Sequence, residues 1–329
     1  MQSHIARFSG LQSVEKFPNG QSNPTYLISA DSDRYVLRMQ PDGELLKSAH
    51  AVDREFKVMQ ALQNTAVPVP EVLHLCLDKS VIGTLFFIMR YVDGRVLWDP
   101  ELPGMTPQHR THLYLNMNKV LADLHSVDIA AVGLGDFGKP GNYYQRQIDR
   151  WTSQYEQTKT ASIPAMEALM LWLNDHVPAD DGQISLIHGD FRLDNLMFAH
   201  DGVAVTGVLD WELSTLGHPF ADLAYQCMQW RLDHSAVVRG LAQTDRKALG
   251  IPTEEEYVKR YCESRGINVI PDWPFYLGFS FFRFAAIVQG VFKRSLDGNA
   301  SSTKAKAYGE LTPVLSRLGL NVVEGRSSG

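Results

Sequence analysis

The chain has few cysteines and no large excess of charge of either sign. Its 329 residues include three cysteines, Cys76, Cys227 and Cys262, which are far apart and form no CxxC pair. This spacing excludes a disulfide framework and a thiolate zinc site, and it fits a reducing compartment. The 31 Lys and Arg residues against 37 Asp and Glu residues give a net charge of −6, without a basic run. We therefore expect no nucleic-acid partner.

Long apolar runs are also lacking. No segment approaches eighteen consecutive apolar residues, and residues 1–7 lack the apolar region of a signal peptide. We therefore expect a cytoplasmic protein with no membrane partner. The hydrophobic content of 44% suffices for a large buried core.

The chain has no glycine-rich nucleotide-binding motif in the sequence context that such a motif requires. Residues 133–140 spell GLGDFGKP, which matches GxGxxG and contains an Asp-Phe-Gly tripeptide. A phosphate-binding glycine turn leaves a strand and opens a helix, whereas this segment follows a helical pattern and runs into Pro140. We interpret it as a loop between helices. His109 and His112, which lack an acidic helper, are interpreted as solvated helix residues.

The pattern of apolar residues predicts two parts. Short β-type runs at 25–28, 35–38 and 85–89, with one helical pattern at 44–62, indicate a small antiparallel sheet with one helix. Helical patterns then follow at 106–126, 142–159, 164–176, 220–239, 253–265 and 273–297, and short β runs at 184–187, 195–198 and 203–209 interrupt them. We predict an α+β fold with a small N-terminal part that contains the sheet, 1–92, and a larger, mainly helical C-terminal part, 93–329.

Polar residues with phosphotransfer chemistry gather between those later β runs. Residues 188–195, HGDFRLDN, place His188, Asp190 and Asn195 at the spacing HxDxxxxN. Phosphoryl transfer needs an Asp to accept or orient the proton of the attacking hydroxyl, and an amide oxygen to bind Mg²⁺. Asp210 follows the next β run, where a second magnesium ligand is expected. We predict Asp190 as catalytic base, Asn195 and Asp210 as metal ligands, and His188 as a catalytic residue that shapes the loop.

These motifs resemble the aminoglycoside phosphotransferase and choline kinase superfamily. The sequence is most similar to the branch associated with acyl-CoA dehydrogenases, with resemblances at 20–26, 35–38, 54–56, 102–104, 283–284 and 298–300. The resemblance implies a protein-kinase-like two-lobed fold, in which 1–92 form the N-terminal nucleotide-binding lobe and 93–329 the C-terminal catalytic and substrate-binding lobe. It also implies ATP and Mg²⁺ as cofactors and a small-molecule hydroxyl as acceptor.

The resemblance also assigns roles to other residues. A loop that covers the ATP phosphates would comprise Gly20, Gln21, Ser22 and Asn23. The phosphate-binding cation would be Arg38, where protein kinases have Lys, steadied by Glu55. Adenine would contact the backbone of Met89, Arg90, Tyr91 and Val92. Asp222 would brace the catalytic loop, and His218, which replaces an Asp of the family pattern, is left unassigned.

The sequence says least about the identity of the phosphate acceptor. Residues 275–292 are rich in aromatic side chains, which indicate a buried core helix or, alternatively, a wall for an acyl chain. Candidate substrate contacts are Arg192, Glu212, Arg283, Lys293 and Arg294. The resemblance makes a hydroxyacyl-CoA the leading acceptor hypothesis and an acyl-CoA dehydrogenase a functional partner. A catalytically weak kinase-like binding protein, an acyl-CoA dehydrogenase and an aminoglycoside kinase remain as alternatives.

Overall fold

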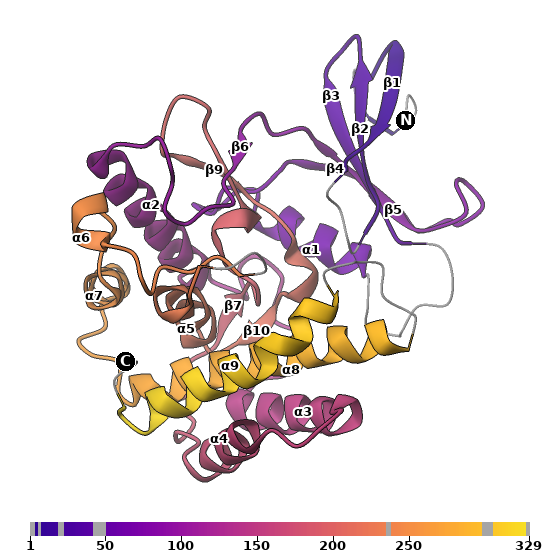
Figure 1. Ribbon diagram of the computed structural model, residues 1–329. Coiled ribbons are helices and arrows are strands. Elements are labelled where there is room, and N and C mark those ends of the chain that lie inside the picture. The colour runs from indigo at the N-terminus through magenta and orange to yellow at the C-terminus, as the bar shows by residue number, and fades with distance from the viewer. Residues whose placement is uncertain are drawn as a thin grey trace. The chain divides into compact units, whose positions relative to one another are not determined.

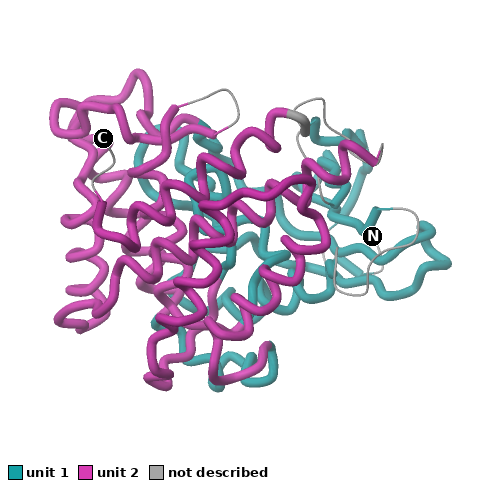
Figure 2. Tube along the Cα trace, turned by 60° about the horizontal axis from the view of Figure 1, so that its bottom comes forward, with its two compact units in different colours: residues 1–98, 126–137, 188–215 teal, residues 99–125, 138–187, 216–329 magenta. Residues whose placement is uncertain are grey.

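The computed structural model describes residues 4–5, 8–18, 23–41, 51–234, 238–297 and 305–326. Contacts along the backbone divide the chain into two compact units. Unit 1 comprises 1–98, 126–137 and 188–215, and unit 2 comprises 99–125, 138–187 and 216–329 (Figure 2). The segment that contains the HxDxxxxN pattern therefore folds with the N-terminal residues.

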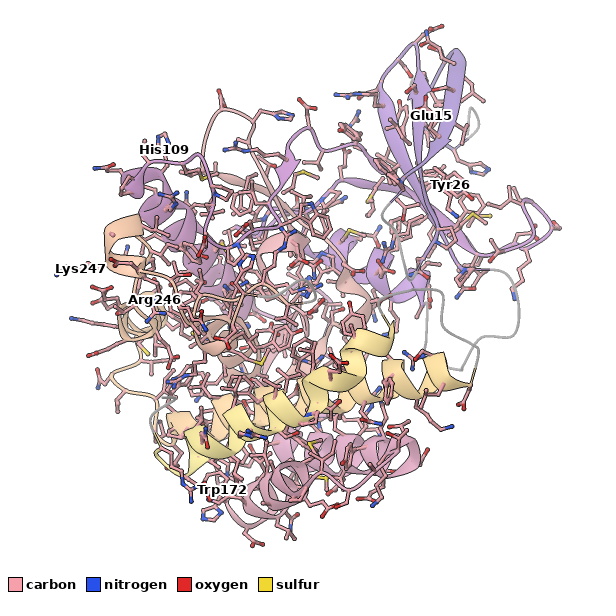
Figure 3. The ribbon with its side chains drawn as sticks, in the orientation of Figure 1. Glu15, Tyr26, His109, Trp172, Arg246 and Lys247 are labelled. Atoms are coloured by element: carbon pink, nitrogen blue, oxygen red, sulfur yellow. The ribbon has the colours of Figure 1, made fainter. Side chains whose placement is uncertain are left out.

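Unit 1 contains a five-stranded antiparallel sheet in the order β1-β2-β3-β5-β4 (Figure 1). Its strands are β1 (Leu11–Lys16), β2 (Thr25–Ala30), β3 (Arg34–Met39), β4 (Val72–Cys76) and β5 (Phe86–Arg90). The three predicted β runs are β2, β3 and β5, so the small antiparallel sheet is confirmed. Glu15 and Tyr26 lie on the neighbouring strands β1 and β2 (Figure 3).

Alternating side chains of this sheet form an apolar core. Ile28, Tyr35, Phe86 and Ile88 are buried together, as the period-2 alternation of strands requires. The predicted helix is α1 (Val52–Leu62), and residues 44–50 of the longer prediction lie outside the described part of the chain. Apolar side chains on one face of α1 are buried, with Asp53 and Glu55 in its first turn.

A second, smaller sheet in unit 1 positions the polar motifs. Its order is β6-β8-β9, with β6 (Arg95–Val96), β8 (Leu196–Phe198) and β9 (Val205–Val208). The 3₁₀ turn η1 (Leu193–Asn195) precedes β8, and η2 (Trp211–Leu213) follows β9. The two predicted β runs on either side of residue 200 therefore form one hairpin.

Unit 2 is mainly helical, as predicted. Its helices are α2 (Pro107–His125), α3 (Tyr143–Thr158), α4 (Pro164–Asp175), α5 (Phe220–Cys227), α6 (Arg246–Leu249), α7 (Glu254–Arg265), α8 (Trp273–Leu296) and α9 (Ala305–Val323). A short two-stranded sheet pairs β7 (Ser185–Ile187) with β10 (Thr215–Gly217). His109 lies on the outer face of α2 (Figure 3), and it is exposed like His112, as solvated histidines are.

The predicted helix 220–239 is too long. Helix α5 ends at Cys227, and the chain tightens into the 3₁₀ turn η3 (Met228–Arg231). The apolar periodicity continues past Cys227 because Met228 and Trp230 are also buried, although the backbone has left the α-helix. Residues 126–142 form no helix or strand, so the interpretation of 133–140 as a loop is confirmed.

Helix α8 is the central core helix of unit 2. It contacts α3, α4, α5 and α9, and it runs beside α9 (Figure 1). The helix is long and apolar enough to cross a membrane by composition, but 78% of its apolar window is buried inside the protein. Its aromatic residues Phe275, Phe279, Phe281 and Phe282 are buried, as the core interpretation predicts.

The predicted boundary between residues 92 and 93 stays a prediction. The first segment of unit 1 ends nearby at Trp98, and the two later segments of unit 1 are not contiguous with it in sequence.

Candidate active site

The loop before β8 holds its two principal side chains together. Asn195 donates from Nδ2 to the carboxylate Oδ2 of Asp190 and to its backbone oxygen, both at 2.9 Å. His188 is fully buried, and its Nε2 lies 2.8 Å from the Leu209 carbonyl oxygen. The Asp190 amide donates to His188 Nδ1 at 3.2 Å. Since Nδ1 accepts, Nε2 carries the proton. The role of His188 in shaping the loop for catalysis stays a prediction.

The β8–β9 hairpin places Asn195 close to Asp210 in the ladder. Leu196 pairs with Val208, and the Leu209 amide donates to the Asn195 carbonyl oxygen at 2.9 Å. Asp210 is therefore one residue beyond a backbone contact with Asn195. The backbone of Asp210 has φ 63° and ψ 60°, a left-handed conformation that is uncommon for a residue with a side chain. Such strain is often retained at functional positions.

A partly buried arginine connects the five-stranded sheet to Asp210. Arg38 on β3 forms an ion pair with Glu55 on α1 at 2.8 Å and donates to Asp210 Oδ1 at 2.6 Å. Asn23 is fully buried and donates to the other Glu55 oxygen at 2.7 Å. The structure thus brings together four residues predicted from separate parts of the sequence.

Burial dominates the acid–base properties of this cluster. It raises the pKa of Glu55 to about 7, with further increases from Asp210 and Glu212 and an opposing effect of Arg38. The pKa of Arg38 is raised because Glu55 and Asp210 together outweigh the burial of its guanidinium. Arg38 therefore stays charged, while Glu55 can take up a proton near neutral pH.

The oxygen atoms available here suit a hard divalent cation. Among the described residues, neither Asn195 Oδ1 nor Asp210 Oδ2 has a hydrogen-bond partner. The Asp210 side chain is 34% exposed, so its carboxylate can be reached. Carboxylate and amide oxygens are the protein ligands that Mg²⁺ prefers. The described residues contain no group of three or more His, Cys, Asp and Glu side chains that could hold a metal ion.

A second arginine, Arg192, lies within the segment 188–195 itself. Arg192 lies 3.5 Å from Asp190 Oδ2 and 3.1 Å from Asp194 Oδ2. Burial raises the pKa of Asp194 despite the nearby guanidinium. Arg192 therefore contacts the predicted base, and Asp194 is a neighbour of this site that the sequence analysis did not select.

Some predicted nucleotide contacts are placed and others are not. Gly20, Gln21 and Ser22 lie outside the described residues. Met89 and Arg90 end β5, where Arg90 pairs with Asp33 and Glu71. The Tyr91 amide donates to the Arg34 carbonyl oxygen, and the Tyr91 ring lies under the Arg34 guanidinium. Val92 follows without a regular element. Their role towards adenine stays a prediction.

Asp222 and the predicted cations of α8 belong to unit 2. Asp222 is the third residue of α5, is buried, and lies 3.3 Å from His125 Nε2. His125 in turn contacts Tyr261 at 2.7 Å, a buried partner that no sequence pattern indicated. The role of Asp222 as a loop brace stays a prediction.

The cations of α8 occupy different environments. The Arg283 guanidinium lies over the rings of Trp151 and Tyr225 at 5.6 and 5.4 Å. Lys293 pairs with Asp297, and Arg294 is exposed. The roles predicted for these cations, and for Glu212 in η2, stay predictions.

Comparison with known proteins places this geometry in context. The model of the phosphotransferase enzyme family matches residues 13–265. A Mus musculus protein named acyl-CoA dehydrogenase family member 10 is 51% identical over 311 residues, covering 94% of this chain and 29% of the mouse protein. The Homo sapiens family member 11 is 40% identical, covering 94% of this chain and 40% of the human protein. The chain thus spans well under half the length of these curated relatives.

Solved structures extend the match to the whole fold. A Ralstonia eutropha protein described as a candidate aminoglycoside phosphotransferase has 49% identity and a TM-score of 0.92, covering 100% of this chain and 97% of that chain. A thermostable aminoglycoside phosphotransferase mutant in complex with AMP-PNP and hygromycin B has 16% identity and a TM-score of 0.62, covering 96% and 95% of the two chains. The predicted kinase-like, two-lobed α+β fold is confirmed by these matches.

Proposed function

The chain belongs to the phosphotransferase enzyme family, and from this premise we propose that it transfers the γ-phosphoryl group of ATP to a hydroxyl of a CoA-linked hydroxyacyl compound. Phosphotransfer to a small-molecule hydroxyl follows from the family. The nucleotide, the metal and the acceptor are the proposed parts.

The observation that supports the chemistry best is the set of contacts among Asp190, Asn195, Asp210 and Arg38 in unit 1. Asn195 orients the Asp190 carboxylate, which in our proposal accepts the proton of the acceptor hydroxyl as the hydroxyl attacks. Asn195 Oδ1 and the Asp210 carboxylate would hold Mg²⁺. When bound, Mg²⁺ supplies positive charge to the phosphate oxygens in the transition state.

Arg38 has two tasks in this proposal. The Arg38 guanidinium can bind the phosphates of the nucleotide, and its ion pair with Glu55 holds the guanidinium in position. Before a cation binds, the positive charge of Arg38 balances the negative charge of the Asp210 carboxylate. With a cation held by Asp210, Arg38 would no longer be needed to balance this carboxylate and would be available to the nucleotide phosphates.

The CoA-linked acceptor is supported by the names of the curated relatives, which are acyl-CoA dehydrogenase family members. This chain covers only a part of them, so a phosphotransferase part and a dehydrogenase part of one longer protein can act on related acyl-CoA compounds. An acyl-CoA dehydrogenase is accordingly the proposed functional partner. The Ralstonia eutropha relative favours an aminoglycoside as the second candidate acceptor.

The test is an ATP-consumption assay of the purified chain with Mg²⁺ and a panel of hydroxyacyl-CoA compounds. The matched controls are the same acyl-CoA thioesters without the hydroxyl, a set of aminoglycosides, and the Asp190→Asn variant. We expect turnover with a hydroxyacyl-CoA only, a product heavier by one phosphoryl group in mass spectrometry, and a loss of kcat of about 10²- to 10⁴-fold in the variant.

Three outcomes would contradict the proposal. Turnover of aminoglycosides alone would replace the acceptor, and equal turnover by Asp190→Asn would remove the assigned base. Tight MgATP binding without turnover of any acceptor would instead favour a kinase-like binding protein.

A further inference from the structure

We propose that Arg54 is a positioning residue that fixes helix α1, and with it Glu55, by tying the helix to the loop 133–137 and to the segment that follows Asp210. The inference rests on the proposed function, because it concerns how the Arg38–Glu55 pair is held for nucleotide binding. All residues involved belong to unit 1.

The contacts of Arg54 join three segments that are far apart in sequence. Its terminal nitrogen Nη2 donates to the Phe137 carbonyl oxygen at 3.0 Å and to the Ser214 carbonyl oxygen at 3.4 Å. Its guanidinium also lies over the Phe137 ring, 3.9 Å from the ring centroid. A planar guanidinium can donate and stack at the same time, which a lysine ammonium cannot.

These contacts close a ring through the proposed active site. Glu55 follows Arg54 directly on α1 and pairs with Arg38, and Arg38 binds Asp210. Asp210 directly precedes the turn η2, and Ser214 directly follows it. The hydrogen bond from Arg54 to Ser214 connects this segment back to α1. A shift of α1 or of η2 would therefore change the Arg38–Glu55 and Arg38–Asp210 pairs together.

The loop 133–137 is suited to serve as a fixed point. Its apolar residues Leu134 and Phe137 are buried, and the loop is held by the backbone bonds of Leu134 to Ile129 and of Phe137 to Leu134. Although helices of unit 2 flank it in sequence, residues 126–137 are part of unit 1 (Figure 2). The segment that resembles a nucleotide motif is thus a support for α1.

The same loop offers a matched control. Lys57, one turn after Arg54 on α1, pairs with Asp136, and these side chains are 47% and 81% exposed. An exposed ion pair of this kind contributes little. If α1 is positioned through Arg54, loss of Lys57 must have a much smaller effect than loss of Arg54.

The experiment measures MgADP binding by calorimetry and amide hydrogen exchange of residues 52–62 in the full chain. The variants are Arg54→Ala, Arg54→Lys, Lys57→Ala, Glu55→Gln and the double variant Arg54→Ala with Glu55→Gln. We expect Arg54→Ala to weaken MgADP binding about fivefold and to speed exchange in α1, Arg54→Lys to recover part of the loss, and Lys57→Ala to resemble the wild type.

The double variant separates positioning from a general loss of stability. Once Glu55→Gln has removed the charge that α1 presents to Arg38, Arg54→Ala should add no further loss of affinity. An additional fivefold loss in that background, or unchanged hydrogen exchange in Arg54→Ala, would overturn the inference. A wild-type chain that binds no MgADP would contradict the proposed function, whereas the exchange of α1 would still decide whether Arg54 holds the helix.

Discussion

Glu55 is a buried acid whose charge depends on its surroundings. It is 1% exposed, accepts from Asn23 and pairs with Arg38, and burial raises its pKa to about 7. Below that pH the carboxyl is protonated and Arg38 loses a charge partner. Above it the ion pair is complete. The proposed nucleotide site therefore titrates in the physiological range.

We predict that MgADP affinity falls about three- to tenfold between pH 8 and pH 6 because Glu55 takes up a proton. In Glu55→Gln the affinity should be low at both pH values, since the charge is missing throughout. Both proteins are titrated calorimetrically at the same pH values. Because the nucleotide is protonated to the same extent in both titrations, its own protonation does not contribute to the difference in affinity between the two proteins. Parallel pH profiles of wild type and variant would show that another group is responsible.

At the scale of elements, the turn between β7 and η1 depends on one glycine. Gly189 has φ 83°, and a β-carbon there would lie 2.6 Å from the Leu213 carbonyl oxygen. Both the left-handed conformation and the backbone contact exclude a larger residue. This glycine lets the segment that begins with His188 pass η2 closely.

Gly189→Ala should therefore destabilise the protein by about 1–3 kcal/mol, and it should lower the midpoint of urea unfolding. Gly135→Ala is the matched control, since no atom lies within 4 Å of a β-carbon there and its φ is not left-handed. We expect the control to stay within about 0.5 kcal/mol of the wild type. Equal midpoints for the two variants would contradict the argument.

The elements also show which parts of the fold the sequence could predict. Helices α2, α3, α4, α7 and α8 were predicted to within two residues because their apolar positions follow the helical period. Strand β1 was missed since five of its six residues are exposed and show no alternation. Helix α9 was missed because it contains Pro313, normally a helix breaker.

In the candidate site, too, local sequence patterns predicted some residues, whereas contacts between distant residues could not be predicted. The HxDxxxxN spacing is local, and it led directly to Asp190 and Asn195. The contact between Arg38 and Asp210 joins residues 172 positions apart, and the role of the loop 133–137 as a support for α1 depends on its contacts. Such contacts are set by tertiary packing, which no local pattern contains.

For the whole molecule, the buried ionisable groups act on stability in opposite directions. Burial lowers the pKa values of His125 and His218, so the unfolded chain binds these protons more readily. Their contribution to the free energy of unfolding is complete above the unfolded histidine pKa and is lost as the pH falls below it. Burial raises the pKa values of Glu55 and Asp194, so the folded chain binds these protons more readily and gains stability as the pH falls.

These signs predict a measurable difference between the wild type and Glu55→Gln. Between pH 7 and pH 5, the buried histidines lower the free energy of unfolding, because the unfolded chain binds their protons more readily than the folded chain does. In the wild type, proton uptake by Glu55 offsets part of this loss. Removal of Glu55 therefore leaves a steeper decrease in stability towards acid, which urea unfolding at pH 7, 6 and 5 will measure. If the two proteins had the same pH slope, Glu55 would have to titrate alike in the folded and unfolded chains, and its burial beside Arg38 would have no effect on its proton affinity.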